Sequence, residues 1–153
     1  MGYDVHPLRE GRALIIGGVR IEHATGLDGH SDADVLTHAV IDSVLGAAGL
    51  GDIGAHFPPD DARYRGASSL TLLAEAARVV ATAGYRVVNV DSTVVAQAPR
   101  LGAHLGEMGR NIARGLGLDI GAVSVKATSP EGIGALGAGE GIAVHAVALI
   151  DET

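Results

Sequence analysis

The stretch Ile142-Ala143-Val144-His145-Ala146-Val147-Ala148-Leu149-Ile150 is apolar at almost every position. Successive side chains of a β-strand point to opposite faces of the sheet, so this pattern predicts a strand that is buried on both faces. Such a strand is covered on each side by helices or by another subunit. We therefore expect the chain to fold around a sheet that contains residues 141–150.

The segments before this strand alternate between strand and helix patterns. Strands are predicted at 14–16 and 19–21, which form a hairpin around Gly17-Gly18, and at 87–96 and 123–127. Helices are predicted from 31–34 to about 49–51, from Ser68 or Ser69 to about 84, and over a stripe of apolar residues from Leu101 to Leu116. Residues 26–29 and 51–61 are predicted to be loops. No repeat or linker interrupts the pattern, so we expect one domain over residues 1–153.

Composition restricts the function further. The chain is 47% hydrophobic but only 3% aromatic, so its core must be built from Ala, Val, Leu and Ile. It contains no cysteine, which excludes disulfides and thiolate zinc sites and leaves histidines and carboxylates as the possible metal ligands. A net charge of −7 argues against general nucleic-acid binding. No apolar run is long enough to span a membrane, and we expect a cytoplasmic, bacterial protein with no membrane partner.

A carboxylate and an imidazole share one face of a predicted strand near the start of the chain. In Asp4-Val5-His6, the side chains of Asp4 and His6 point the same way. With a third ligand they would form a zinc site that keeps a vacant position, and His38, in a predicted helix, is a candidate. The spacing alone favours a surface ion pair instead.

Polar residues also gather near the start of that helix. His30 and Ser31 precede it, and a helix N-terminus offers free N–H groups and a positive dipole end, so the two fit a phosphate contact. Asp34, His38 and Asp42 are spaced four residues apart and share one stripe of the helix. A solvated face with ion pairs is the alternative explanation for this stripe.

Two other strands end in polar segments. Thr128 and Ser129 could bind phosphate oxygens and Glu131 a hard cation such as Mg²⁺, while backbone groups of residues 96–100 could contact a base edge. Ordinary turns explain both segments as well. Residues 132–137 match G-x-G-x-x-G, but the 16 residues that follow form a strand pattern and leave no room for the helix and second strand of a dinucleotide fold.

Taken together, these segments resemble the 2-C-methyl-D-erythritol 2,4-cyclodiphosphate synthase family of the non-mevalonate isoprenoid pathway. The matching stretches are DVHP from Asp4, GGVRI from Gly17, GLDGHSDADVLTHAVIDSVLGAAGLGDIGAHFP from Gly26, VDSTVVAQAP from Val90, VKATSPEGIG from Val125 and GEGIA from Gly139. The resemblance runs nearly end to end, and the long central block is highly specific.

The resemblance implies both a fold and a reaction. The fold would be a two-layer α/β sandwich, a mixed sheet with helices on one face, and three subunits would turn their sheets inward with active sites between them. The reaction would be the cyclisation of 4-diphosphocytidyl-2-C-methyl-D-erythritol 2-phosphate with release of CMP, catalysed by a phosphorus–oxygen lyase. A trimeric protein that binds cytidine nucleotides or isoprenoid phosphates without turnover is the alternative, and a zinc phosphohydrolase is a third.

The resemblance also implies roles for individual residues. Zinc would be held by Asp4, His6 and His38, and a second ion, Mg²⁺ or Mn²⁺, by Glu131. His30 and Ser129 are similar to the catalytic stabilisers of the transition state. The implied substrate-binding residues are Asp4, His6, His30, Ser31, Asp52, Gly54, Ala96, Pro99, Arg100, Thr128, Ser129 and Glu131.

The sequence departs from the family pattern at a few positions. Arg100 and Ser129 stand where lysine and threonine are common, so charge and hydroxyl are kept. Ala135 and Ala138 stand where the family often has an aromatic residue and an arginine beside the trimer axis. This puts the binding of an isoprenoid diphosphate in the central cavity in doubt, but not the main reaction.

Overall fold

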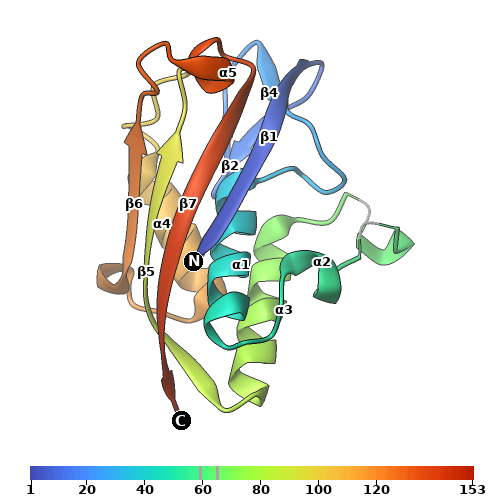
Figure 1. Cartoon of the computed structure of the whole chain (residues 1–153), viewed down its shortest axis with the longest axis vertical. Coiled ribbons are helices and arrows are strands. Elements are labelled where there is room, and N and C mark those ends of the chain that lie inside the picture. Colours follow the sequence, from blue (N-terminus) through green and yellow to red (C-terminus); the bar gives the residue numbers. More distant parts are fainter. Residues whose placement is uncertain (59, 65) are drawn as a thin grey trace.

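The computed structural model describes residues 1–153 except Pro59 and Arg65, and Figure 1 shows its two layers. Pro59 belongs to the predicted loop 51–61 and lies outside the described residues. One layer is a five-stranded sheet in the order β4-β1-β7-β5-β6, in which only β5 and β6 run parallel. The strands are β1 (Gly2–Glu10), β4 (Thr25–Leu27), β5 (Tyr85–Val95), β6 (Val123–Thr128) and β7 (Gly141–Glu152).

The second layer consists of helices that cover one face of this sheet. The helices are α1 (Val35–Ala47), α3 (Ser69–Thr82) and α4 (Leu105–Leu116), with shorter turns at α2 (Ile53–His56), η1 (Ala62–Tyr64), η2 (Ile120–Ala122) and α5 (Gly134–Gly137). A separate hairpin joins β2 (Leu14–Ile16) to β3 (Val19–Ile21), as predicted. The predicted mixed sheet with helices on one face is therefore confirmed. No helix among the described residues is long and apolar enough to cross a membrane.

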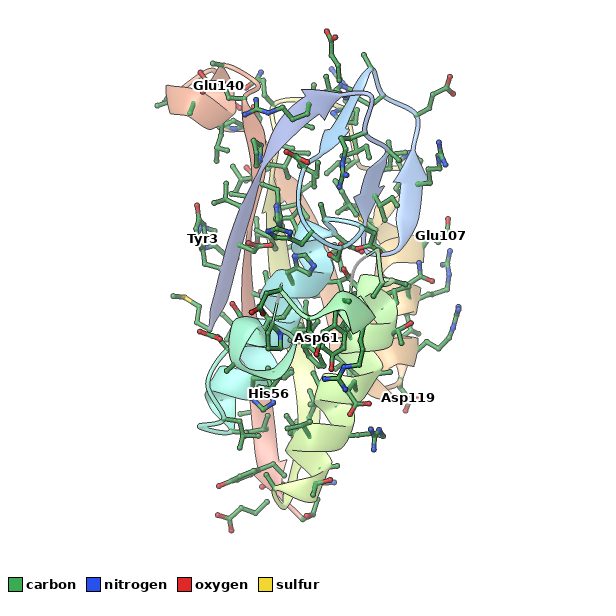
Figure 2. The ribbon with its side chains drawn as sticks, turned by 90° about the vertical axis from the view of Figure 1, so that its right-hand side faces the viewer. Tyr3, His56, Asp61, Glu107, Asp119 and Glu140 are labelled. Atoms are coloured by element: carbon green, nitrogen blue, oxygen red, sulfur yellow. The ribbon has the colours of Figure 1, made fainter. Side chains whose placement is uncertain are left out.

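β7 lies at the centre of the sheet, as its apolar sequence predicts. Ile142, Val144 and Ala146 are fully buried beneath the helices. The opposite face is uncovered in the single chain, where Val147 and Leu149 are each 55% exposed. Neighbouring side chains on β1 continue this apolar face, and Figure 2 shows Tyr3 on the side of the sheet away from the helices.

Three of the predicted assignments are wrong. Residues 25–27 form a strand rather than a loop, because the buried Leu27 pairs with Leu8 along the free edge of β1. Residues 53–56 form a helical turn, since the Asp52 side chain accepts a hydrogen bond from Ala55 N. α4 begins at Leu105 rather than Leu101. The segment 132–137, which matches G-x-G-x-x-G, contains one turn of helix, α5.

The fully buried carboxylate of Asp34 joins the hairpin to the start of α1. As N-cap of α1 it accepts hydrogen bonds from Thr37 N at 3.0 Å and Thr37 Oγ1 at 2.8 Å. It also accepts from Gly17 N at 2.8 Å and Gly18 N at 2.6 Å. Gly17 and Gly18 have φ values of 57° and 69°, which a residue with a side chain adopts only with strain. The hairpin turn is thus fixed by a residue of the helix layer.

We expect Asp34→Ala to lower the free energy of unfolding by about 3 kcal/mol, because it removes a helix cap and leaves buried donors unpaired. Urea unfolding would measure the change. Asp119→Ala is the matched control, since Asp119 is the exposed N-cap of η2 and its side chain makes no capping hydrogen bond. Equal and small losses in the two variants would contradict this role for Asp34.

Candidate metal centre

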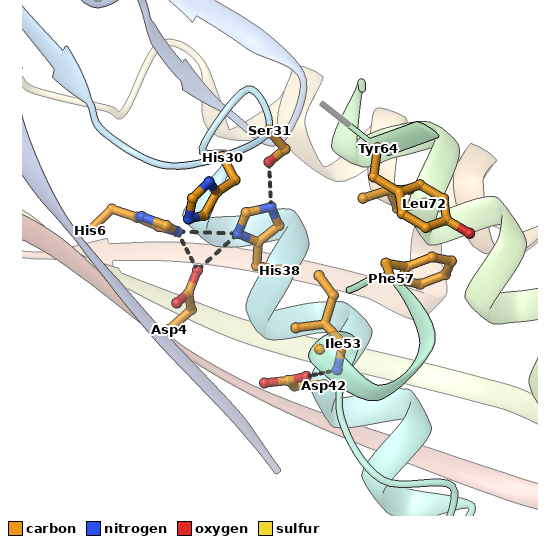
Figure 3. A pocket seen from close by; sticks show the side chains of 11 residues that line it. Asp4, His6, His30, Ser31, His38, Asp42, Ile53, Phe57, Tyr64 and Leu72 are labelled. Atoms are coloured by element: carbon orange, nitrogen blue, oxygen red, sulfur yellow. Dashed lines mark hydrogen bonds and ion pairs between the residues drawn. The ribbon is translucent and has the colours of Figure 1, made fainter. Parts of the chain in front are cut away.

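The Asp4 and His6 side chains meet His38 between the sheet and the helix layer. β1 places Asp4 and His6 on its helix-facing side, opposite Val144 and Ile142 of β7. His38 projects from the first turns of α1 toward them, as Figure 3 shows. Strand alternation therefore orients two of the three groups, and the packing of α1 on the sheet brings the third.

The donor atoms of the three side chains form a nearly equilateral triangle. Asp4 Oδ2 lies 3.0 Å from His6 Nε2 and 3.1 Å from His38 Nδ1, and the two nitrogens are 3.2 Å apart. A tetrahedral zinc ion with bonds of about 2.0–2.1 Å has ligands about 3.3 Å apart, so the triangle fits three of its corners with little movement. In the described part of the chain, no other group of three such residues has this proximity.

The tautomer of His6 also suits a metal ligand. His6 Nδ1 lies 2.8 Å from the carbonyl oxygen of Asp28, which can only accept, so Nδ1 carries a proton and donates it. In the neutral ring the lone pair of Nε2 therefore points at the carboxylate of Asp4. Gly29 makes room for this ring, because a Cβ there would lie 2.9 Å from His6 Cε1. Two electron-rich groups face each other here, an arrangement that a cation stabilises.

Contacts within the triad also set the ionisation of Asp4 and His6. Burial raises the pKa of Asp4, but the contacts with the imidazoles of His38 and His6 outweigh it and hold the pKa well below its usual value. Burial lowers the pKa of His6, but the hydrogen bond to Asp4 and the charge of that carboxylate outweigh burial and raise the pKa above 6.5. A proton on His6 Nε2 thus occupies the position that a metal ion would take.

A pocket of about 240 Å³ opens beside the triad. The predicted residues His30, Ser31 and Gly54 line it, together with apolar residues that sequence analysis missed: Ile53, Phe57, Tyr64 and Leu72. The ring of Phe57 packs edge-on against Tyr64, with centroids 5.4 Å apart. The available signal in the sequence was the chain's single phenylalanine, within the predicted loop 51–61, followed by a tyrosine seven residues later.

The aspartates near this pocket differ in role. Asp42 lines the pocket and its Oδ1 accepts a hydrogen bond from Ile53 N at 2.8 Å, which ties α2 to α1. Burial raises the pKa of Asp42, although the Ile53 N–H opposes this. Asp52 is exposed and caps α2 rather than lining the pocket. The free N–H groups predicted at the start of α1 are partly taken, because Asp34 caps Thr37 N.

The other predicted residues gather at a second pocket of about 550 Å³. It is lined by Ala96, Gln97, Pro99, Arg100, Leu101, Gly102, Leu105, Ala127, Thr128 and Ser129. Glu131 lies two residues after Ser129, the last of these lining residues, and has a left-handed conformation with φ 53°. Its N–H donates to Ser129 Oγ at 3.0 Å. Gln97, within the predicted segment 96–100, accepts a hydrogen bond from Gly132 N through its side-chain oxygen at 3.0 Å. Among the described lining residues, none is shared with the pocket at the triad.

An α/β sandwich that opens an Asp-His-His donor triad onto a pocket defines a candidate metalloenzyme of the catalytic type, with three protein ligands and a vacant position. The sequence model of the YgbB family matches residues 1–151. The chain therefore belongs to the YgbB family, and the predicted family membership is confirmed.

Curated relatives extend this match over nearly the whole chain. The 2-C-methyl-D-erythritol 2,4-cyclodiphosphate synthase of Syntrophomonas wolfei is 58% identical over 151 residues, which cover 99% of this chain and 96% of that protein. The enzyme of the same name from Bordetella pertussis is 59% identical over 149 residues, with 97% and 92% covered.

Solved structures share the fold. The bifunctional IspDF from Campylobacter jejuni matches with a TM-score of 0.95 and 42% identity, over 99% of this chain and 41% of that chain. A CDP-bound form of 2C-methyl-D-erythritol-2,4-cyclodiphosphate synthase matches with a TM-score of 0.89 and 35% identity, over 98% and 97% of the two chains.

Zinc affinity is expected to depend on pH through His6. A metal ligand must be deprotonated, so zinc has to displace the proton that the raised pKa of His6 holds on Nε2. We expect the affinity to rise about tenfold per pH unit below that pKa and to level off above it, with the break above pH 6.5. Competition with a chromophoric chelator at several pH values would measure it. A flat profile, or a break below that value, would contradict the assignment of His6.

Proposed function

We propose that this chain, as a single catalytic domain, converts 4-diphosphocytidyl-2-C-methyl-D-erythritol 2-phosphate to 2-C-methyl-D-erythritol 2,4-cyclodiphosphate and CMP. The reaction is a step of non-mevalonate isoprenoid biosynthesis, for which we expect a cytoplasmic enzyme. The convergence of Asp4, His6 and His38 on one point is the observation that carries the proposal. Membership of a family whose curated members carry this name supports it.

The reaction exchanges one phosphorus–oxygen bond for another. An oxygen of the 2-phosphate attacks the β-phosphorus of the diphosphate, and the bond between that phosphorus and the bridging oxygen breaks, so the α-phosphate leaves with the cytidine as CMP. The attacking oxygen is already ionised, so no strong general base is required. What is required is alignment of two anionic groups that repel each other, and neutralisation of their charge.

The chain offers ligands for two kinds of cation. Asp4, His6 and His38 would hold zinc, the ion that a set of two imidazoles and one carboxylate suits. Glu131 would hold Mg²⁺ or Mn²⁺, ions that often use one or two carboxylates and complete their shell with substrate phosphates. When bound, these ions supply positive charge at the diphosphate oxygens and lower the barrier to attack.

The remaining predicted residues bind and orient the two ends of the substrate. His30 and Ser129 would donate hydrogen bonds to the phosphoryl oxygens as charge develops on them. The pocket beside the triad, with Ser31, Gly54 and the nearby Asp52, would take the methylerythritol phosphate. The second pocket would take the cytidine, against Ala96, Pro99, Arg100 and Thr128.

A homotrimer would bring these two pockets together. The triad and the cytidine pocket share no described lining residue, so one site could be built from one pocket of each of two neighbouring subunits. The outer face of the sheet exposes four large apolar side chains, Tyr3, Val5, Val147 and Leu149, each 46–55% exposed, which contact with other copies would bury. Packing the sheets inward would supply the second cover that β7 lacks in the single chain.

Incubation of the protein with the substrate, Zn²⁺ and Mg²⁺ should give the cyclic diphosphate and CMP, detected by phosphorus NMR and mass spectrometry. A chelator should abolish the products. His38→Ala should reduce CMP release at least about a hundredfold, because it removes a ligand that positions the reacting groups. His23→Ala is the control, since His23 bonds only locally, to Thr25.

Each other outcome identifies a different function. Binding of the substrate without turnover would favour the non-catalytic nucleotide-binding protein, and linear products would favour a phosphohydrolase that uses water. Full turnover by His38→Ala would contradict the metal site.

Val147→Lys is expected to prevent trimer formation, because it places an additional charge on the outer face of β7, which the trimer would bury. CMP release should fall with the loss of the trimer while zinc affinity stays unchanged, since all three ligands belong to one chain. Sedimentation velocity and zinc titration would measure both. Ile120→Lys is the matched control, at a residue that is 53% exposed but lies outside the sheet. Monomers that retain full activity would contradict the shared site.

A further inference from the structure

Ser69 and Asp32, which resemble ordinary helix-start residues in the sequence, lie directly behind His38. Ser69 Oγ is 2.9 Å from His38 Nε2, the ring nitrogen that faces away from Asp4. Ser69 in turn donates its hydroxyl proton to Asp32 Oδ1, and its backbone N–H to Asp32 Oδ2 at 3.0 Å. Ser69 is fully buried, so water does not compete for its hydroxyl.

A count of protons decides the direction of these hydrogen bonds. A hydroxyl has one proton, and that of Ser69 goes to the Asp32 carboxylate, which can only accept. Toward His38, Ser69 Oγ can therefore only accept, so His38 Nε2 must carry a proton. The second hydroxyl at this nitrogen, that of Ser31 at 3.1 Å, can donate its own proton to Ser69 Oγ at 3.4 Å, so it does not require a lone pair on His38 Nε2. With the proton on Nε2, the lone pair of the neutral ring is on Nδ1, which faces Asp4 and His6.

We propose that Asp32 and Ser69 are positioning residues that hold His38 in the tautomer able to bind a metal ion through Nδ1. The inference rests on the metal site of the proposed function and adds residues that act behind it. His6 is held in its tautomer by a backbone carbonyl. His38 stands on a helix and uses a serine backed by a carboxylate for the same purpose.

Helix capping accounts for the contact of Asp32 with Ser69 N, but not for the contact of the Ser69 hydroxyl with His38. The N-cap of α3 is Ser68, and its side chain makes no capping hydrogen bond. Asp32, 37 residues away in sequence, accepts the first N–H of the helix in its place. That contact needs the carboxylate and the backbone of Ser69, but not the hydroxyl of Ser69. The hydroxyl can therefore accept a hydrogen bond from His38, whose imidazole is its nearest partner apart from Asp32.

Asp32→Asn tests the proton count with almost no change of shape. An asparagine oxygen can still accept from Ser69 N, the stronger of the two backbone contacts at 3.0 Å, and its NH₂ group then replaces Oδ1, gives up the 3.3 Å contact with Asp34 N and donates to Ser69 Oγ. Ser69 would then donate its own proton to His38 Nε2 and leave the proton of the ring on Nδ1. Histidine ¹⁵N–¹H correlation spectra of the metal-free protein distinguish the two tautomers. We expect His38 to be protonated on Nε2 in the wild type and on Nδ1 in Asp32→Asn.

Zinc affinity, measured by chelator competition, provides the second readout. We expect it to fall about 10–100-fold in Asp32→Asn and in Ser69→Ala, the range found when residues that orient metal ligands are replaced. Ser68→Ala is the matched control, because it changes the neighbouring serine of the same helix start and should leave both the tautomer and the affinity unchanged. Ser69→Ala keeps the Asp32 contact to the helix backbone, so it also reports if Asp32→Asn does not fold.

The inference is overturned if His38 keeps its Nε2 proton in Asp32→Asn, or if Ser69→Ala and Asp32→Asn bind zinc as tightly as the wild type. A wild type that binds no zinc would instead overturn the metal site of the proposed function. The tautomer spectra are recorded without metal, so they would still decide whether Asp32 controls His38.

Discussion

One carboxylate oxygen and two imidazole nitrogens are held about 3 Å apart by elements that lie 34 residues apart in the chain. Without a proton or a cation between them, three lone pairs would face one another at a partly buried point, which is unfavourable. The fold sustains this arrangement because β1 pairs with the central strand β7 along residues 2–7, and α1 packs against both strands. The rest of the site is built around this point.

Charge explains why an acidic chain can act on a polyanion. The net charge of −7 opposes the approach of a triphosphorylated substrate, and the pocket at the triad and the second pocket contain few cationic side chains, with Arg100 in the second pocket as the clearest. Bound divalent ions would reverse the local sign of the potential where the phosphates react. The apolar wall of Phe57, Tyr64 and Leu72 beside the triad would strengthen that effect by excluding water.

Much of the fold follows from periodicity. The apolar pattern of residues 141–150 predicted the central strand, and alternation placed Asp4 and His6 on one face. Periodicity predicts which face of an element a residue occupies, but not how far it lies from another element. His38 was therefore only a candidate ligand from its spacing, and the structure shows it beside β1. The short strand at 25–27 and the turn at 53–56 escaped prediction because they depend on a tertiary pairing and a side-chain cap. The role of Asp32 and Ser69 was not predicted for a related reason. Aspartate and serine serve both as helix-capping residues and as residues that orient a metal ligand, so residue type does not distinguish the two roles.

X-ray absorption at the zinc edge of the zinc-loaded protein would test the account most directly. We predict four ligands, of which two are imidazole nitrogens at about 2.0–2.1 Å and one is a carboxylate oxygen, with a fourth oxygen that changes when CDP is added. His38→Ala should lose one imidazole from this shell. A shell of oxygens alone, or one that the loss of His38 leaves unchanged, would contradict the claim that Asp4, His6 and His38 form an open metal centre.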